Sequence, residues 1–312
     1  MRIVALAGGI GGARFLQGLK VAAPDADITV IVNTGDDISL YGLRICPDLD
    51  TVMYTLAGGI DTARGWGRQD ETFRAKEELA AYDAPAAWFG LGDRDLATHL
   101  YRKHLMLAGL SLSEVTAELC RRWDTGVRLL PMTDQQAETH VLVDDADKPR
   151  KRKAMHFQEW WIRHRAALPA HGIVLVSEGT PAPAPGVLDA IEAADVVLLP
   201  PSNPVVSVGT ILQVKGIRNA LADKRVVGIS PIIGGAPVRG MADACLTAIG
   251  VETSAEAVGR HYGSELLDGW LVDTTDDGVT VPGVQVRAVP LLMTDAAATA
   301  AMARAALDLA GV

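Results

Sequence analysis

The 312-residue sequence has only three cysteines, Cys46, Cys120 and Cys245, and no two of them have the C-x-x-C spacing. This excludes a zinc ribbon and a framework of disulfide bonds, and we expect all three thiols to be reduced. No apolar run reaches the roughly 18 residues of a membrane-spanning helix, and the first residues already predict a strand rather than a signal peptide. We therefore expect a cytoplasmic protein with no membrane partner.

Positive charge is also scarce in this chain. The sequence has 29 Lys and Arg against 38 Asp and Glu, which gives a formal net charge of −9. Because nucleic-acid binding surfaces are strongly basic, we expect no nucleic-acid partner. Small anionic ligands are still compatible with this charge where glycine loops, arginines or a metal ion supply local positive charge. Hydrophobic residues make up 49% of the chain, which is enough to bury a sizeable core.

Glycine, by contrast, is concentrated near the start of the chain, at Gly8, Gly9, Gly11 and Gly12. The cluster follows an apolar run over residues 3–7 and precedes a helical pattern. A strand, a glycine loop and a helix in this order can hold phosphates, because glycines let the backbone approach the phosphate and the helix N-terminus supplies free N–H groups. The spacing fits neither G-x-G-x-x-G nor a Walker A loop, so for this motif alone a simple turn is an equal alternative.

Apolar runs alternate with helical patterns towards both ends of the chain, which predicts an α/β fold. The runs predict buried strands over residues 2–7, 28–33, 173–177, 196–199 and 226–230. The middle of the chain is largely helical in pattern, with helices expected over residues 71–82, over 96–107 and from Ser111. We therefore expect a Rossmann-like doubly wound, mainly parallel sheet built from residues 1–60 and 170–312, into which residues 61–169 are inserted as a mostly helical lobe.

Two acidic motifs follow the second predicted strand. Asp36 and Asp37 stand at its carboxyl end, where adjacent carboxylates suit Mg²⁺ together with substrate phosphates. For an isolated Gly-Asp-Asp, however, a turn is the favoured interpretation. In the motif PDLD, Asp48 is expected to cap a helix that ends at Leu56. Asp50, in the first turn of that helix, could point into a cleft and either accept a hydrogen bond from a substrate hydroxyl or hold a metal ion.

Two further segments carry polar side chains that are suited to ligand binding. Ser202 and Asn203 are enclosed by prolines after a predicted strand, and the fixed shape of such a loop favours ligand binding over an ordinary turn. In the segment GDRDLATH, Arg94 could bind a phosphate or form an ion pair, and Asp95 is expected to cap the next helix. Without further context the structural interpretation of this second segment, including His99, is favoured.

Together these segments resemble the phosphoenolpyruvate / 2-phospho-L-lactate transferase family of coenzyme F-420 biosynthesis. The matching stretches keep their order from residue 4 to about residue 294, and they include AGGIGGARFLQGL, VNTGDD, ICPDLDTVMYTLAGGI, WFGLGDRDLATH, HFQEWW, PPSNPVVSVGTIL and GISPIIGGAP. Members of this family join a phosphoenolpyruvyl or phospholactyl group, carried on guanosine diphosphate, to the deazaflavin Fo and release GMP. The tryptophan-rich segments look closest to the actinobacterial type, which uses the phosphoenolpyruvyl donor.

The resemblance implies a role for each candidate residue. The donor's diphosphate would lie along Gly8, Gly9, Gly11 and Gly12, with Ser202 and Asn203 opposite. Asp36, with Asp37 beside it, would hold the magnesium ion, and Arg94 would help to stabilise the charge on the transferred group. Asp50 would bind the acceptor's polar edge or hydroxyl. Some relatives have a lysine at the acceptor site where this chain has Gly90, so a contact there would come from the backbone or from a different neighbour.

The resemblance leaves some alternatives open. Either Asp36 or Asp50 could take the proton from the acceptor hydroxyl, and the lobe over residues 61–169 would bind the acceptor. A homodimer is expected from the family. A related branch acts as a nucleotide-sugar-binding regulator without transferase activity. A dinucleotide-dependent dehydrogenase is less well supported, because such an enzyme needs an acid at the end of the second strand, where Asn33 stands.

Overall fold

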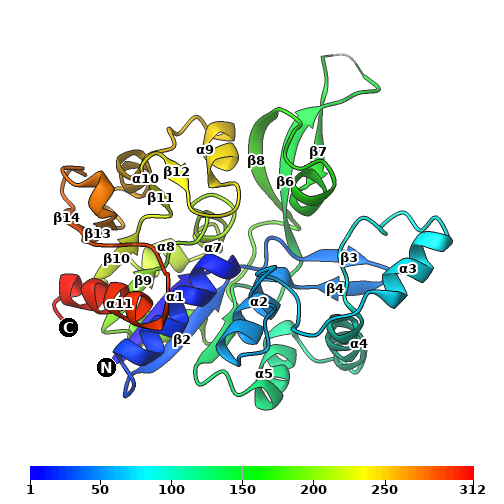
Figure 1. Ribbon diagram of the computed structural model, residues 1–312, viewed down its shortest axis with the longest axis horizontal. Helices are drawn as coiled ribbons and strands as arrows, with labels where there is room; N and C mark the ends of the chain where they lie inside the picture. Colours follow the sequence, from blue (N-terminus) through cyan, green and yellow to red (C-terminus); the bar gives the residue numbers. More distant parts are fainter. Residues whose placement is uncertain (149) are drawn as a thin grey trace.

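The computed structural model describes residues 1–148 and 150–312. Its centre is a seven-stranded sheet in the order β14-β13-β10-β9-β1-β2-β5, with every neighbouring pair parallel (Figure 1). The strands are β1 (Arg2–Ala7), β2 (Asp27–Val32), β5 (Arg128–Pro131), β9 (Val196–Leu199), β10 (Val226–Ile229), β13 (Gly269–Val272) and β14 (Gln285–Ala288). The expected Rossmann-like parallel sheet is therefore confirmed.

The direction in which strands are added changes beside β1. The chain places β2 and β5 on one side of β1, and β9, β10, β13 and β14 on the other side. In an open α/β sheet, such a change leaves a crevice at the carboxyl ends of the two strands where it occurs. The loops that follow β1 and β9 therefore lie on either side of this crevice, and these are the glycine loop and the loop that contains Ser202.

Helices cover both faces of the sheet because the side chains of its strands alternate between two cores. Ile3 and Ala5 of β1 belong to a core with α1 (Gly9–Ala22), α2 (Pro47–Leu56) and α11 (Ala296–Ala310). Val4 and Leu6 belong to a second core, which also takes in side chains of α6 (Val187–Ala193), α7 (Val208–Ile211), α8 (Ile217–Ala220), α9 (Ala242–Ala248) and α10 (Ala255–Tyr262). The result is a three-layered core.

Glycine allows two helices of the first core to pack closely. A Cβ atom built at Gly18 of α1 would lie 2.5 Å from the backbone carbonyl of Thr299 in α11. Any larger residue at this position would have to push the two helices apart. This contact fixes α1, and with it the loop at its N-terminus, against the C-terminal helix of the chain.

The segment between β4 and β5 supplies the expected helices. They are α3 (Arg74–Ala81), α4 (Asp93–Leu107) and α5 (Leu112–Trp123). Ser111 caps α5, since its hydroxyl accepts from the Glu114 N–H while the Glu114 carboxylate accepts from the Ser111 N–H. A short hairpin, β3 (Ile38–Leu40) and β4 (Leu43–Ile45), precedes α2, and β11 (Ile232–Ile233) and β12 (Ala236–Pro237) form a second one after β10.

The prediction of a core strand over residues 173–177 was wrong about the sheet. These residues belong to β8 (Ala170–Ser177), which pairs antiparallel with β6 (Ala137–Asp144), and β6 pairs with β7 (Arg152–His156). A run of valine, isoleucine and leucine gave no alternation to indicate one exposed face, yet Val174 and Val176 are 37% and 47% exposed. The three-stranded sheet stands apart from the central sheet, and the β6–β7 hairpin projects from it (Figure 1).

Two short helical segments complete the fold, η1 (Glu159–Arg163) after β7 and η2 (Thr274–Asp276) after β13. Between β9 and β10 the chain forms two short helices, α7 and α8. Across residues 1–148 and 150–312, no helix combines the length and the apolar character needed to cross a membrane.

Candidate active-site cavity

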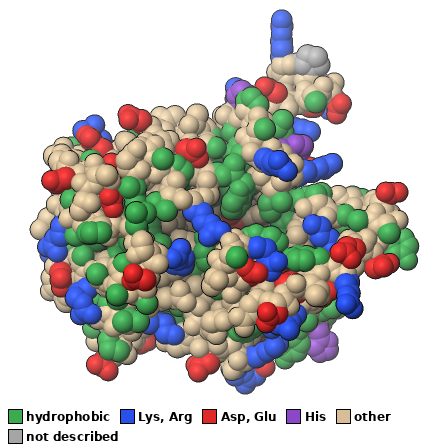
Figure 2. Space-filling model, in the orientation of Figure 1, with side chains coloured by type: hydrophobic (Ala, Val, Ile, Leu, Met, Phe, Trp, Pro, Cys, Tyr) green, Lys and Arg blue, Asp and Glu red, His purple; other side chains and the backbone are tan. Residues whose placement is uncertain are grey.

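A cavity of about 810 Å³ lies at the crevice between the glycine loop and the loop after β9. Its lining includes Gly8, Gly9, Gly11, Asp36, Asp50, Gly90, Ser202 and Asn203, all of which were candidates from the sequence. Residues 64–67, from the segment between α2 and α3, also line it, as do aromatic side chains of later segments. In the space-filling view, Lys, Arg and hydrophobic side chains gather near the middle of the molecule (Figure 2).

The glycine loop is fastened directly to the loop after β9. The Gly8 N–H donates to the Ser202 hydroxyl at 3.1 Å, and that hydroxyl donates to the Gly8 carbonyl at 2.9 Å. A Cβ atom at Gly12 would lie 2.5 Å from the same hydroxyl, and one at Gly11 would lie 2.5 Å from the Pro201 carbonyl oxygen. Glycines at these positions therefore let the two loops touch. Gly12 supports this contact and is not among the residues that line the cavity.

Asn203 also has a role within its own loop. Its side-chain carbonyl accepts from the N–H groups of Val205 and Val206, at 2.9 and 3.2 Å. This arrangement is an Asx turn, in which a short polar side chain replaces a backbone acceptor. The polar atoms that Ser202 and Asn203 offer to a ligand are therefore fewer than the sequence suggested, although both residues line the cavity.

Three buried carboxyl groups, which we call the loop acids, lie near the glycine loop: Asp36, Asp37 and Asp48. Asp37 forms an ion pair with Arg44 at 2.9 Å and does not line the cavity. Asp48 accepts from the Asn33 side-chain amide at 2.9 Å. Within the described residues, the Oδ1 atom of Asp36 has no hydrogen-bond partner. Asp36 thus lines the cavity and has a buried oxygen whose hydrogen-bonding capacity is not satisfied by the described residues.

The loop acids Asp36 and Asp48 have raised pKa values. Burial, followed by the nearby charge of Asp48, raises the pKa of Asp36 well above its ordinary value. Burial also raises the pKa of Asp48 to about 6, although hydrogen bonds from Asn33 and from the backbone of Gly9 lower it. Two neighbouring carboxylates in a buried place favour binding of a cation, because only an added positive charge lets both ionise.

The expected helix cap at Asp48 was wrong. The helix α2 begins at Pro47 with Cys46 as its N-cap residue, and no side chain caps it. Proline suits the first helical position because it has no N–H to satisfy there. Asp48 therefore lies in the first turn, where its carboxylate interacts with Asn33 and with the backbone of Gly9 at the start of α1.

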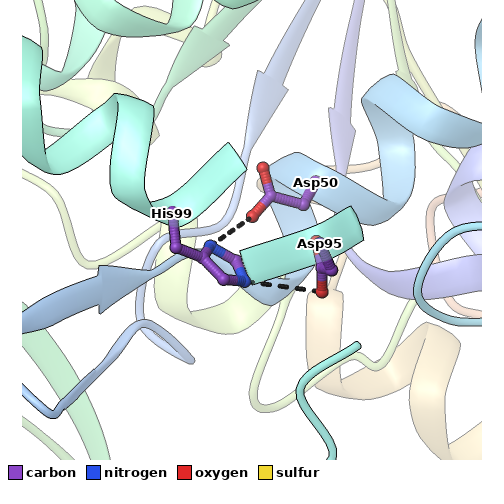
Figure 3. Close-up of side chains that lie close together, drawn as sticks. All are labelled: Asp50, Asp95 and His99. Atoms are coloured by element: carbon purple, nitrogen blue, oxygen red, sulfur yellow. Dashed lines mark ion pairs between the residues drawn. The ribbon is translucent and has the colours of Figure 1, made fainter. Parts of the chain in front are cut away.

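A second group of buried polar side chains, which we call the α4 group, consists of Asp50, Asp95 and His99 (Figure 3). His99 Nδ1 lies 3.7 Å from Asp50 Oδ2, and His99 Nε2 lies 3.4 Å from Asp95 Oδ2. Each residue offers one ligand atom, and the three atoms lie within 4.8 Å of one another. The group is therefore a possible metal site by distance. Asp95 does not cap α4, since Gly92 is the N-cap residue and Glu71 accepts from the Asp95 N–H.

A buried cation, Arg102, lies against the α4 group, and sequence reasoning missed it. Arg102 is 2% exposed and donates to Asp50 Oδ1 and, at 3.3 Å, to the Arg44 carbonyl. Its Nη1 atom also lies 3.0 Å from His99 Nδ1. A helical spacing could have identified it, because Asp95, His99 and Arg102 are separated by four and three residues and so share one face of α4.

The carboxyl groups of the α4 group have different pKa shifts. Burial raises the pKa of Asp50 more than the charges of Arg102 and His99 lower it. Burial also acts on Asp95, but the hydrogen bond and charge of His99, with the hydrogen bond from Tyr54, lower the pKa of Asp95 overall. The Tyr54 hydroxyl lies 2.8 Å from Asp95 Oδ1. Asp95 is therefore held ionised by its neighbours, and Asp50 Oδ2 has no hydrogen-bond partner among the described residues.

The remaining candidates, Gly90 and Arg94, lie in different environments. A Cβ atom at Gly90 would be 2.8 Å from the Trp66 ring, so only the backbone of this residue is available to a ligand. Arg94 is half-exposed, donates to the Gln69 carbonyl at 3.2 Å and is not among the cavity-lining residues. The described arginines that do line the cavity are Arg14, Arg64 and Arg239, none of which the sequence patterns singled out.

Comparisons with known proteins can be set beside this geometry. The family model described as 2-phospho-L-lactate transferase CofD matches residues 3–295. A protein named phosphoenolpyruvate transferase from Thermobifida fusca is 63% identical, covering 99% of this chain and 98% of its own length. A protein of the same name from Streptomyces coelicolor is 65% identical, covering 99% of this chain and 98% of its own length. Another from Mycobacterium sp. (strain KMS) is 56% identical, covering 100% of this chain and 99% of its own length.

A solved structure with the same fold is a member of the UPF0052 family from Bacillus halodurans. It aligns with a TM-score of 0.66 over 98% of this chain and 99% of its own. The two sequences are only 18% identical, so this likeness supports the fold alone. The fold and the sequence comparisons thus agree over nearly the whole chain.

Proposed function

The chain belongs to the 2-phospho-L-lactate transferase CofD family and is a transferase, and we propose that it makes a precursor of coenzyme F-420. It transfers a phosphoenolpyruvyl group, or the related 2-phospho-L-lactyl group, from a guanosine diphosphate donor to the deazaflavin Fo and releases GMP. The observation that carries the proposal is the position of Asp36, a buried carboxylate with an unpartnered oxygen, in a cavity that the glycine loop also lines.

The donor's diphosphate fits the glycine loop. Gly8, Gly9 and Gly11 line the cavity at the N-terminus of α1, where the first N–H groups of the helix have no partners within it. Gly9 has φ +62°, a conformation that residues with a side chain rarely adopt. Free N–H groups and the positive end of the helix dipole suit a diphosphate at this place.

The residues near the glycine loop also fit a magnesium ion. Mg²⁺ prefers oxygen ligands and is commonly held by one or two carboxylates together with substrate phosphates. Asp36 offers such an oxygen, and Asp48 adds a second negative charge nearby, whereas Asp37 is already neutralised by Arg44. When bound, the ion would reduce the negative charge on the diphosphate and favour the departure of GMP. In this proposal Asp36 is the ligand and Asp37 supports it indirectly.

The acceptor fits the opposite side of the cavity. Trp66, Phe89, Phe157 and Trp161 line it and offer apolar surface for a flat deazaflavin ring. Asp50 also lines it, and its Oδ2 atom is without a hydrogen-bond partner in the described part of the chain. We assign to Asp50 the binding of the terminal hydroxyl of Fo, with Arg102 holding the carboxylate in place.

The reaction is a substitution at phosphorus. The hydroxyl oxygen of Fo forms a bond to the phosphorus that carries the enolpyruvyl group, and the bond from that phosphorus to the oxygen of GMP breaks. The hydroxyl proton passes to Asp50 Oδ2, whose raised pKa suits a general base. Such reactions depend chiefly on in-line positioning and on stabilisation of charge, and the N–H groups of the glycine loop can provide part of both.

Mass spectrometry tests the proposal. Purified protein is incubated with Fo, Mg²⁺ and either the enolpyruvyl or the lactyl diphosphoguanosine donor, and the product and GMP are measured. We expect GMP and an Fo derivative with the added group, in equal amounts. A nucleotide-sugar-binding regulator would not bind Fo, so a titration that follows Fo fluorescence is the companion measurement. Absence of Fo binding at high micromolar concentration, with GDP and Mg²⁺ present, would show that the proposal is wrong.

A further inference from the structure

Arg239 connects two separate parts of the cavity wall. It lies in the loop between β12 and α9, and its guanidinium donates to the Arg64 carbonyl at 2.7 Å. A Cβ atom at Gly65 would be 2.8 Å from each of three guanidinium atoms of Arg239, so the flat face of the group lies against Gly65. Arg239 and residues 64–67 all line the cavity. The arginine therefore connects the loop before α9 with the segment that precedes α3, where both line the cavity.

Arg239 differs from the other two arginines of the cavity in what it binds. Arg14 donates to the Met293 carbonyl from the glycine-loop side. Arg64 forms an ion pair with Asp61 at 2.9 Å, and its guanidinium lies 5.2 Å from the centre of the Trp66 ring. Within the described residues, Arg239 has no ion pair and only this one side-chain hydrogen bond. Most of its five N–H donors are therefore available to a ligand.

The transferred group carries a second anion, to which no residue has yet been assigned. Besides its phosphate, the enolpyruvyl or lactyl group has a carboxylate. The cavity wall presents Asp36, Asp48, Asp50 and Asp95, which would repel this carboxylate. A planar guanidinium matches a carboxylate with two parallel hydrogen bonds. Arg239 lines the same cavity as the glycine loop, Asp36 and Asp50, so it can reach a group that is transferred within that cavity.

We propose that Arg239 is the specificity-determining residue that binds the carboxylate of the transferred group. The inference rests on the proposed function, because it takes the donor from it. Arg239 keeps its contact with the Arg64 carbonyl through one nitrogen while other N–H groups bind the carboxylate. It thereby holds residues 64–67 over the reacting phosphorus and selects donors that carry a carboxylate over plain GDP.

The test compares two ligands on the same protein. Binding of GDP and of enolpyruvyl diphosphoguanosine is measured by calorimetry, with Mg²⁺ present, for the wild type, Arg239→Gln and Arg239→Lys. We expect Arg239→Gln to weaken binding of the enolpyruvyl donor roughly 10- to 100-fold, the range for hydrogen bonds to a charged group, and to change GDP binding less than about two-fold. Arg239→Lys should lie between, because it keeps the charge and loses the paired geometry.

The controls separate this inference from the function on which it rests. Arg260→Gln removes an exposed arginine of α10 that pairs with Glu256 and should leave both affinities unchanged. The inference is overturned if Arg239→Gln binds the enolpyruvyl donor as tightly as the wild type, or if it loses GDP binding by the same factor. If the wild-type protein itself binds neither ligand, the proposed function is wrong and the inference is wrong with it. Thermal unfolding verifies that each variant is folded. If Arg239→Gln is not folded, the affinities of Arg239→Lys for the two ligands test the inference instead.

Discussion

The loop acids and the α4 group are both buried clusters that contribute carboxylates to one cavity, but they differ in what neutralises them. The α4 group has Arg102, a buried guanidinium on Asp50 and close to His99. Of the loop acids, Asp37 has Arg44, while Asp36 and Asp48 have no cation in the described part of the chain. The α4 group therefore has a cation of its own beside it, whereas Asp36 and Asp48 do not.

This difference decides between two places for a metal ion. The three ligand atoms of the α4 group are close enough for a metal, yet Arg102 already occupies that neighbourhood with a positive charge. One of the three ligands is also a histidine nitrogen, whereas Mg²⁺ prefers oxygen. Asp36 has an oxygen without a hydrogen-bond partner in the cavity that the glycine loop lines, and no cation of the described residues pairs with it. We therefore propose that magnesium binds at the loop acids and that His99 and Arg102 position Asp50.

The largest effect should come from removing the charge of the open loop acid. Asp36→Asn should reduce transfer by at least about 10³-fold while the protein stays folded, because the loss of a metal-held charge costs several kcal/mol of transition-state stabilisation. Initial rates of GMP release measure the change, and Asp223→Asn, an exposed acid outside the cavity, is the matched control. Turnover near that of the wild type in the Asp36→Asn protein with excess Mg²⁺ would remove Asp36 from the site.

The second effect concerns the stability that Arg102, the buried cation against the α4 group, provides. Arg102→Met should lower the free energy of unfolding by about 3–5 kcal/mol, because Asp50 is then a buried charge without a partner. Adding Asp50→Asn to Arg102→Met should recover part of this loss, since the unpaired charge is removed. Urea unfolding of the two variants measures both values. If Arg102→Met unfolds at the wild-type midpoint, the two clusters do not differ in the way described.

A third effect, of moderate size, tests the contact between the two loops. Gly11→Ala places a Cβ atom 2.5 Å from the Pro201 carbonyl oxygen, so the glycine loop must move away from the loop after β9. We expect GDP binding to weaken roughly ten-fold and Fo binding to stay within about two-fold, because only the phosphate side is displaced. Gly42→Ala is the control, with positive φ but nothing near its Cβ position and no place in the cavity lining. Unchanged GDP affinity in Gly11→Ala would mean that the loop is only a turn.

The smallest effect is a pH-dependent stabilisation by Asp48→Asn in the metal-free protein. Burial raises the pKa of Asp48 from 3.8 to about 6, so the folded state holds its proton more tightly than the unfolded state. By linkage, the wild type loses stability as pH rises between about 4 and 6, and the loss is complete above that range. The variant should therefore match the wild type near pH 4 and exceed it at pH 7 by up to about 3 kcal/mol, the value of a pKa difference of about two units. Thermal unfolding of both proteins in EDTA at the two pH values measures the difference. A variant less stable than the wild type at pH 7 would mean that Asp48 is favourably ionised in the folded state.

The glycine loop and the positions of Asp36 and Asp50 could be predicted from the sequence, because the relevant signals are local. The apolar run before Gly8 and the helical pattern after it specify a strand, loop and helix with no long-range information. Asp36 follows the second predicted strand, and Asp50 lies in the first turn of the next predicted helix, so their placement near the carboxyl end of the sheet follows from the fold. These two acids do line one cavity, although their roles stay predictions.

The features that were missed depend on long-range contacts. Asp48 has the spacing of a helix cap, but its partners are Asn33 and Gly9, from two other elements. Arg239 has a defined environment only because Gly65, 174 positions earlier, lies beneath it. The edge strand β8 has valines on its exposed positions, so no alternation revealed the separate sheet. In each case the deciding neighbour is distant in the sequence.

A magnesium titration tests the difference between the two clusters most directly. Mg²⁺ is titrated by calorimetry into the GDP-saturated wild type and into the Asp36→Asn and Asp95→Asn variants. The account predicts that the wild type and Asp95→Asn bind the ion with similar affinity and that Asp36→Asn loses binding by at least about ten-fold. Loss of binding in Asp95→Asn with full binding in Asp36→Asn would place the metal in the α4 group and contradict the account.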